Sequence, residues 1–328
     1  MRIAVLSGGI GGARFISGLR DALASRPAAE VTVVGNTADD IWLFGLRVCP
    51  DLDTIMYTLG GGIDTERGWG RAEETWHAKE ELAAYGVEPA WFGLGDRDIA
   101  THLVRTQMLG AGFPLSDVTE ALCARWKLGV RLIPMTDDRV ETHVVIDDAE
   151  QPDGQRAVHF QEYWVRLQAP VAHAVIPVGA ADAKPGPGVL EAIADADVVI
   201  FPPSNPVVSI GTILAVPGVA DAVRATSAAV VGVSPIIGGS PVRGMADRLL
   251  PVIGVDVTAQ SVGAHYGARS AGGLLDGWLV DESDDAVVAP LTALGLGVRA
   301  VPLFMNNRDL ARALAAEVLD LADVLHRG

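Results

Sequence analysis

Apolar and polar positions along the chain predict strands followed by helices at both of its ends. Residues 3–14 begin with an apolar run, break into a glycine-rich turn at residues 8–12 and continue into a helical pattern. A second apolar run at 31–34 is followed by a polar stretch at 35–40. The order strand, turn, helix, strand is typical of the first unit of an α/β fold.

The middle of the chain has a different pattern. Residues 51–127 carry helical periodicity, and the predicted helices are 53–59, 73–85, 98–109 and 115–126, separated by glycine or proline turns. Strand patterns return at 130–134, 143–146 and 157–160. The polar stretch 147–155 predicts a hairpin or an exposed turn.

From residue 189 the alternation of helix and strand resumes. Strands are predicted at 197–201, 228–233, 277–280 and 298–301, and helices up to 194, after 209, near 245, near 259 and from 308. We therefore expect an α/β fold: a Rossmann-like, mostly parallel sheet with helices on both faces and an inserted, mainly helical cap subdomain. We assign 1–50 and 165–328 to the nucleotide-binding core, and 51–164 to the inserted cap and acceptor-binding region.

Composition limits the classes of partner. The 328 residues are 49% hydrophobic and 20% charged, enough for a large core in one domain or two. The formal charge of −16 disfavours nucleic acid or an anionic membrane as the partner, because both attract basic surfaces. The two cysteines lack metal-site spacing. Since a strand opens the chain and no apolar run of about 18 residues follows, we expect a cytoplasmic protein.

The glycine-rich turn predicts a phosphate-binding loop. Without β-carbons at Gly8, Gly9, Gly11 and Gly12, the backbone could approach a pyrophosphate closely at the positive end of the next helix. Packing alone would also explain such glycines. A nicotinamide enzyme would carry an acidic residue for a ribose hydroxyl about 20 positions later. The adjacent carboxylates of Asp39 and Asp40 suit a hydrated divalent cation at least as well.

Two acidic motifs in the predicted insertion are candidates for chemistry. Asp51 and Asp53 lie at a predicted helix start, where either could be an N-cap. Asp96-Arg97-Asp98 places a cation between two carboxylates just before another helix. A capped, salt-bridged helix start is the structural alternative for this second motif.

Two loops in the second half are candidates for the nucleotide site. Asn205, fixed by Pro206, can present a donor and an acceptor to a guanine-like ring. Residues 209–212 begin a helix and offer amides to an anion. Residues 233–244 form a second glycine-rich loop that contains Arg243. Because both loops follow predicted strands, they would form the walls of one cleft.

Eight groups of short motifs follow one another along the whole chain. They are SGGIGGAR, NTADD, CPDLDT with MYTLGGG after it, GDRDIATH, FQEYW, PSNPVVSIG, SPIIGG with PVRGMAD, and LLDGWLVDE. Together they resemble the 2-phospho-L-lactate transferase / phosphoenolpyruvate transferase family of coenzyme F420 biosynthesis, in its actinobacterial branch. The resemblance implies a Rossmann-like core, a helical cap and a homodimer. It also implies a magnesium-dependent transfer of a guanosine-diphosphate-activated three-carbon acid to the ribityl hydroxyl of the deazaflavin Fo, with release of GMP.

The resemblance assigns roles to residues of this sequence. The guanosine nucleotide would be bound by Gly8, Gly9, Gly11, Gly12, Asn36, Thr37, Ser204, Asn205, Pro235, Ile236, Gly238 and Arg243. Asp39 and Asp53 would bind Mg²⁺ with support from Asp40, because this ion keeps several waters and takes one or two carboxylates. Arg97 would neutralise charge at the attacked phosphorus. Asp53 or Asp96 would accept the hydroxyl proton, with His102 as a rival base.

The acceptor ring is flat and apolar with polar edges, so it would need aromatic or aliphatic walls. The acceptor-binding residues would be Asp53, Trp91, Phe92 and His102, with Trp69 and Trp76 as further candidates. Tryptophans in a small helical insertion also serve as core, which is the alternative for each.

Two other functions fit parts of the pattern. A related nucleotide-sugar-binding regulatory family shares the glycine loop without established transferase chemistry, and a nicotinamide oxidoreductase shares the fold. The three-carbon acid stays open among enolpyruvate, lactate and glycerate, although the actinobacterial resemblance points to enolpyruvate. These acids differ by one functional group, and such a difference in a binding pocket changes rates by only about 10- to 100-fold.

Overall fold

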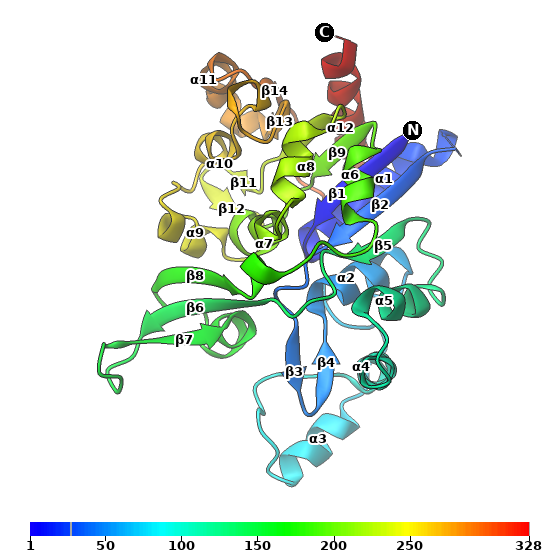
Figure 1. The fold of residues 1–328 in the computed structure, drawn as a ribbon, viewed down its shortest axis with the longest axis vertical. Coiled ribbons are helices and arrows are strands. Elements are labelled where there is room, and N and C mark those ends of the chain that lie inside the picture. Colours follow the sequence, from blue (N-terminus) through cyan, green and yellow to red (C-terminus); the bar gives the residue numbers. More distant parts are fainter. Residues whose placement is uncertain (27, 328) are drawn as a thin grey trace.

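Parallel strands form the centre of the molecule. The structure, a computed structural model, describes residues 1–26 and 28–327. The central strands are β1 (Arg2–Ser7), β2 (Glu30–Gly35), β5 (Arg131–Pro134), β9 (Val198–Phe201), β10 (Ala229–Val233), β13 (Gly277–Val280) and β14 (Gly297–Ala300). Within the described residues they make a seven-stranded sheet of order β14-β13-β10-β9-β1-β2-β5, in which every neighbouring pair is parallel (Figure 1). The predicted α/β fold is confirmed.

Helices cover both faces of this sheet. Alternate side chains of β1 point to opposite faces, so Ile3 and Val5 enter one core while Ala4 and Leu6 enter another. The first core is completed by α1 (Ile10–Ala22), α2 (Pro50–Leu59) and α12 (Arg308–Arg327). The second is completed by α6 (Val189–Ala194), α7 (Gly211–Ala215), α8 (Val219–Ala225), α9 (Ala246–Leu249), α10 (Ala259–Tyr266) and α11 (Val288–Ala293).

Between β2 and β5 the chain forms a hairpin, helix α2 and three further helices. The hairpin consists of β3 (Ile41–Leu43) and β4 (Leu46–Val48), and the helices are α3 (His77–Ala84), α4 (Asp96–Gly110) and α5 (Leu115–Cys123). Figure 1 shows the hairpin and α3 projecting away from the central sheet. The four helices predicted in this region are confirmed, although the one predicted at 73–85 begins only at His77.

The insertion expected at 51–164 differs from the structure in two respects. Strand β5 lies within that range but pairs in parallel with β2, so it belongs to the central sheet. Helix α2 also lies within it, yet its side chains share a core with α1. The range also holds β6 (Glu141–Asp147) and β7 (Gln155–His159), and β6 pairs antiparallel with β7 and with the unpredicted β8 (Ala172–Val178) in a second sheet.

The chain turns sharply after β9. A π-helical segment, η4 (Pro206–Ile210), runs directly into α7, and its five side chains are buried. Among the described residues no single helix is long and apolar enough to cross a membrane, and the pair Pro206–Ala215 and Val219–Ala225, bent by 87°, passes that test only when both are combined.

Candidate active site

The glycine loop after β1 packs tightly against the turn that follows β9. The Gly8 amide donates to Ser204 Oγ at 3.2 Å. A Cβ at Gly11 would lie 2.3 Å from the Pro203 carbonyl oxygen, and one at Gly12 would lie 1.9 Å from Ser7 Oγ. Glycine is therefore required here for packing between two strand ends. The same packing places the start of α1 at the carboxyl edge of the sheet, where parallel α/β folds bind ligands.

Asn36 joins three loops at this edge and is fully buried. Its Nδ2 donates to Asp51 Oδ2 at 2.9 Å and to the Val208 carbonyl at 3.2 Å. Its Oδ1 accepts from the Ala38 amide and from Thr212 Oγ1. Both donor positions and both acceptor positions are used. The prediction that Asn36 contacts the nucleotide is therefore not supported by the side chain, which instead holds the loops together.

Four carboxylates are buried beside the glycine loop. Burial raises the pKa of Asp39 well above its usual value, and the charges of Asp51 and Asp40 raise it further. Burial also raises the pKa of Asp51 to about 6. The pKa of Asp40 is likewise raised to about 6 by burial, against the opposing charge of Arg47. The charge of Asp53 also raises the pKa of Asp40, so the four carboxylates form one acidic group in which Asp39, Asp40 and Asp51 disfavour ionising together.

These carboxylates have the chemistry of a partial magnesium site. Asp39 Oδ1 and Asp53 Oδ2 are buried oxygens that have no hydrogen-bond donor among the described residues. In that part of the chain no three His, Cys, Asp or Glu side chains are grouped as a complete metal site. Hard oxygen donors in small number suit Mg²⁺, which takes its remaining ligands from water and phosphate. The residues therefore fit Mg²⁺ bound together with a phosphorylated ligand.

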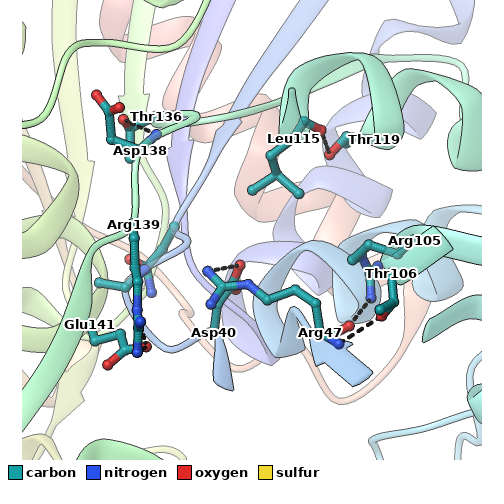
Figure 2. Close-up of polar contacts among 12 residues, drawn as sticks. Asp40, Arg47, Arg105, Thr106, Leu115, Thr119, Thr136, Asp138, Arg139 and Glu141 are labelled. Carbon is teal, nitrogen blue, oxygen red and sulfur yellow. Dashed lines mark hydrogen bonds and ion pairs between the residues drawn. The ribbon is translucent and has the colours of Figure 1, made fainter. Parts of the chain in front are cut away.

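Two buried arginines hold the acids from the cap side. Arg47 Nη2 donates to Asp40 Oδ2 at 3.1 Å, and the Arg47 amide donates to Thr106 Oγ1 at 2.8 Å. Arg105 Nη1 donates to the Arg47 carbonyl at 3.2 Å, and its Nη2 donates to Asp53 Oδ1. Figure 2 shows Arg47 between Asp40 and the α4 residues Arg105 and Thr106. The hairpin is thereby fastened to α4 directly beside the acidic group.

His102 is buried within this arginine cluster. The side chain is 1% exposed, with Nδ1 2.9 Å from Arg105 Nη1 and Nε2 3.3 Å from Asp98 Oδ2. Asp98 Oδ1 accepts from the Tyr57 hydroxyl at 2.7 Å. Both ring nitrogens of His102 thus face protein groups. The structure offers neither nitrogen to an acceptor substrate, contrary to the predicted acceptor-binding role.

The later loops form the opposite side of the glycine loop. Asn205 Oδ1 caps η4 by accepting from the Val207 and Val208 amides, which leaves its Nδ2 free of contacts among the described residues. Ile236 is fully buried in the core, and Pro235 before it is also buried. The Gly238 amide donates to Asp284 Oδ2 at 3.0 Å. Of the residues predicted here, Ser204 and Asn205 lie where a nucleotide could touch them, whereas Ile236 has its side chain in the core.

Arg243 reaches from the second glycine-rich loop to the cap. Its Nη1 is so close to Gly68 that a Cβ there would lie 2.4 Å away. Burial lowers the pKa of Arg14 on α1, and the charge of Arg243 lowers it further. Two arginines with like charges therefore lie near the start of α1, which is an arrangement suited to an anion.

Asp96 and Arg97 occupy structural positions at the start of α4. Asp96 accepts from Thr75 Oγ1 at 2.5 Å and from the amides of His77 and Ala78, so it caps α3. Arg97 is 48% exposed and pairs with Glu73 at 3.0 Å. Neither side chain makes a polar contact with Asp39 or Asp53 in the described part of the chain. This geometry matches the capped, salt-bridged alternative and does not bring the two predicted catalytic residues to the acidic group.

The aromatic candidates pack within the cap. Trp91 and Phe92 meet edge to face at 5.7 Å, and Phe92 packs with the hairpin. A cavity of about 30 Å³ lies beside Phe92, Phe44 and Leu94, which is far smaller than a tricyclic ring. Trp69 and Trp76 meet edge to face at 6.4 Å, and the Arg67 guanidinium carbon is 5.3 and 5.2 Å from their rings. In this conformation all four therefore serve as cap packing, and Trp69 alone of the four is strongly exposed at 46%.

Comparison with known sequences decides the family. The sequence profile described as 2-phospho-L-lactate transferase CofD matches residues 3–296. The chain belongs to the CofD family. Among curated relatives, this CofD-family chain is 66% identical to the phosphoenolpyruvate transferase of Streptomyces coelicolor over 98% of both chains. It is 63% identical to the protein of the same name from Kitasatospora aureofaciens over the full length of both, and 61% identical to that of Nocardia farcinica over 98% and 95%.

Solved structures support the fold of this CofD-family protein. The crystal structure of BH3568 from Bacillus halodurans superposes with a TM-score of 0.61 over 97% of this chain and 99% of that one, at 20% identity. A second crystal structure of BH3568, described as a member of the UPF0052 family, gives a TM-score of 0.60 at 17% identity. At this identity the likeness establishes the shared fold only.

Several residues in and around the candidate site were missed from the sequence. They include Arg47, Tyr57, Arg71 and Arg105. Asp98, His102 and Arg105 are spaced four and three residues apart, so they share one helix face, and this spacing could have revealed the cluster. No comparable signal marks Arg71, whose guanidinium carbon lies 5.0 Å from the Trp126 ring and 5.6 Å from the Tyr57 ring.

Proposed function

We propose that this CofD-family transferase of coenzyme F420 biosynthesis is a phosphoenolpyruvate transferase. It would transfer the phosphoenolpyruvyl group of enolpyruvyl-diphospho-5'-guanosine to the ribityl hydroxyl of 7,8-didemethyl-8-hydroxy-5-deazariboflavin (Fo), giving dehydro-F420-0 and GMP. The observation that carries the proposal is identity of 60–66% to proteins named phosphoenolpyruvate transferase over 94% or more of the chain. Lactyl-diphospho-5'-guanosine, which would give F420-0, is the alternative donor.

The regulatory alternative has no comparable support. The solved structures of BH3568, at 17–20% identity, share the fold alone. The relatives above 60% identity carry a transferase name instead. A homodimer is part of the proposal, and sedimentation velocity of the purified protein tests it.

The proposed binding mode follows from the site geometry. Amides at the start of α1 would bind the diphosphate, because unpaired helix N–H groups attract phosphate oxygens. Asn205 Nδ2 would face the base, since its other carboxamide atom is used by η4. Asp39 and Asp53 would hold Mg²⁺ through their unpartnered oxygens. Bound Mg²⁺ would supply neutralising charge to the phosphate oxygens.

The proposed reaction needs little covalent chemistry from the protein. The ribityl oxygen forms a bond to the phosphorus that bears the three-carbon acid, and the bond from that phosphorus to the GMP oxygen breaks in line. Of the two carboxylates considered as bases, Asp53 keeps an oxygen without a hydrogen-bond donor among the described residues, whereas both Asp96 oxygens accept hydrogen bonds at the start of α3. His102 is enclosed between Arg105 and Asp98. Asp53 would therefore accept the hydroxyl proton.

Mass spectrometry of the products tests the proposal. Purified protein is incubated with Mg²⁺, Fo and either the enolpyruvyl or the lactyl guanosine diphosphate, first separately and then in competition. We expect dehydro-F420-0 and equimolar GMP, with enolpyruvyl preferred. F420-0 as the favoured product would reassign the donor. Tight GDP binding without product from either donor would support the regulatory alternative instead.

A further inference from the structure

Asp53 is held by a helix that belongs to the cap. Asp53 lies in the first turn of α2 and is 5% exposed, while Arg105 lies on α4 and is 2% exposed. The Arg105 guanidinium donates through Nη2 to Asp53 Oδ1, and through Nη1 to the Arg47 carbonyl. Only one Asp53 oxygen is used in this way. Oδ2 lies 3.7 Å from His102 Nδ1, beyond hydrogen-bond distance, and has no hydrogen-bond donor among the described residues. The contact thus fixes which carboxylate oxygen is free.

Arg105 also fixes the state of His102. A guanidinium can only donate, so His102 Nδ1, 2.9 Å from Arg105 Nη1, must be the acceptor in that contact. The ring proton is then on Nε2, which faces Asp98 Oδ2 at 3.3 Å. Asp98 in turn accepts from the Tyr57 hydroxyl. His102 has no lone pair free for a substrate proton, and it acts as an acceptor that orients Arg105.

We propose that Arg105 is the positioning residue for Asp53, oriented by His102, and that it keeps Asp53 Oδ2 directed to the bound cation and the attacking hydroxyl. The effect of Arg105 on the reaction rests on the proposed function, whereas the orientation of Asp53 by Arg105 does not. Three groups share one planar donor fork: Asp53, the Arg47 carbonyl and His102. A lysine ammonium carries the same charge but cannot match the directions of all three.

Arg269 provides a matched control for Arg105. Its guanidinium donates to both Asp276 oxygens and to the carbonyls of Thr226 and Ala228, so it is also a multiply bonded arginine paired with a carboxylate. Asp276 and Ala228 directly precede β13 and β10, at the amino edge of the sheet and opposite the glycine loop. Arg269→Lys therefore reports the cost of weakening a structural arginine away from the site.

The experiment compares Arg105→Lys with Arg269→Lys by three measurements: Mn²⁺ binding in the presence of GDP by electron paramagnetic resonance, GDP binding by calorimetry, and kcat with KM for the donor. Partners that orient a metal-binding group typically contribute about 10- to 100-fold in metal affinity or activity. We expect Arg105→Lys to lower both Mn²⁺ affinity and kcat by about 10- to 100-fold, while its GDP affinity stays within twofold of the wild type. We expect Arg269→Lys to lower only the melting temperature. Equal effects of both variants on Mn²⁺ affinity and kcat would overturn the inference.

A second pair of variants tests the role of His102 and covers the case in which Arg105→Lys fails to fold. His102→Asn supplies an acceptor oxygen near the position of Nδ1, whereas His102→Leu supplies none. We expect His102→Asn to keep kcat within a few-fold of the wild type. We expect the kcat of His102→Leu to fall as far as that of Arg105→Lys. Equal loss in both would identify His102 as a base and overturn its positioning role. If the wild-type protein forms no product, the proposed reaction fails, while Mn²⁺ binding by the four variants still decides the role of Arg105.

Discussion

Gly11→Ala tests whether the glycine loop needs its contact with the turn after β9. Alanine is favoured over glycine inside a helix by about 1 kcal/mol, so helix propensity alone predicts a more stable protein. The new Cβ, however, would lie 2.3 Å from the Pro203 carbonyl oxygen, whereas ordinary contact begins near 3.4 Å. The first turn of α1 and the Pro203 backbone must therefore separate by about 1 Å, because neither is a flexible side chain.

The expected magnitudes follow from this separation. Overpacking costs about 1–3 kcal/mol, so after the propensity gain the net loss should be about 0–2 kcal/mol. A displacement of about 1 Å at a binding loop can lower turnover about 100-fold, and the bond between the Gly8 amide and Ser204 Oγ should weaken with it. Catalysis should suffer far more than stability.

Urea unfolding, GDP calorimetry and single-turnover kinetics measure these effects separately. Gly110→Ala on α4 is the control, because a Cβ there would meet nothing within 4 Å and should stabilise by about 0.5–1 kcal/mol. The reasoning would be refuted if Gly11→Ala gained stability as the control does and retained GDP affinity and turnover.

Three further variants and removal of the metal with EDTA test the site. Arg97→Lys should change the free energy of unfolding by less than about 0.5 kcal/mol, because the Glu73 partner is 79% exposed. Unchanged kinetics would establish that Arg97 forms a surface ion pair. A tenfold fall in kcat would instead place Arg97 at the substrate. Asp51→Asn should stabilise the protein by up to about 3 kcal/mol at pH 7.5, but not at pH 4. The pKa of Asp51 is about 6 in the folded protein and 3.8 for an ordinary aspartate. The stability that this carboxyl gives the wild type is therefore present at low pH and is lost as the pH rises through 6. Urea unfolding at both pH values checks this, and an equal difference at the two would contradict it. EDTA should abolish turnover reversibly, and Asp39→Asn should raise the Mg²⁺ concentration for half-maximal activity at least about tenfold; activity that is indifferent to EDTA would remove the metal from the proposal.

The central strands were predictable because they are short, continuous apolar runs bounded by glycine or polar turns. The strand predicted at 277–280 matches β13 at both ends. Strand β8 was not predicted. It lies at the edge of its sheet and none of its side chains is fully buried, so its sequence does not alternate clearly between apolar and polar residues. The hairpin Ile41–Val48 was missed because its strands have three residues each, too short to show a period.

The site was predictable only where local sequence determines geometry. The loop at Gly8 and the acids at Asp39 and Asp53 were found because each directly follows a strand or begins a helix. The role of Asp96 depends on amides at His77 and Ala78, about 19 residues away, and no local pattern shows that they approach. The saturation of Asn36 depends on Asp51, Val208 and Thr212, and the last two lie more than 170 residues further along the chain. Such partners come together only through the tertiary fold.

The place of β1 in the middle of the sheet has a consequence for synthesis of the chain. As residues leave the ribosome, β1 can pair with β2 early, but its other neighbour begins only at Val198. Until then one edge of β1 is open, and open strand edges invite aggregation. The wall that supports the glycine loop, at Pro203 and Ser204, emerges later still. A nascent protein thus carries Asp39, Asp40, Asp51 and Asp53 long before the wall that supports the glycine loop has been made.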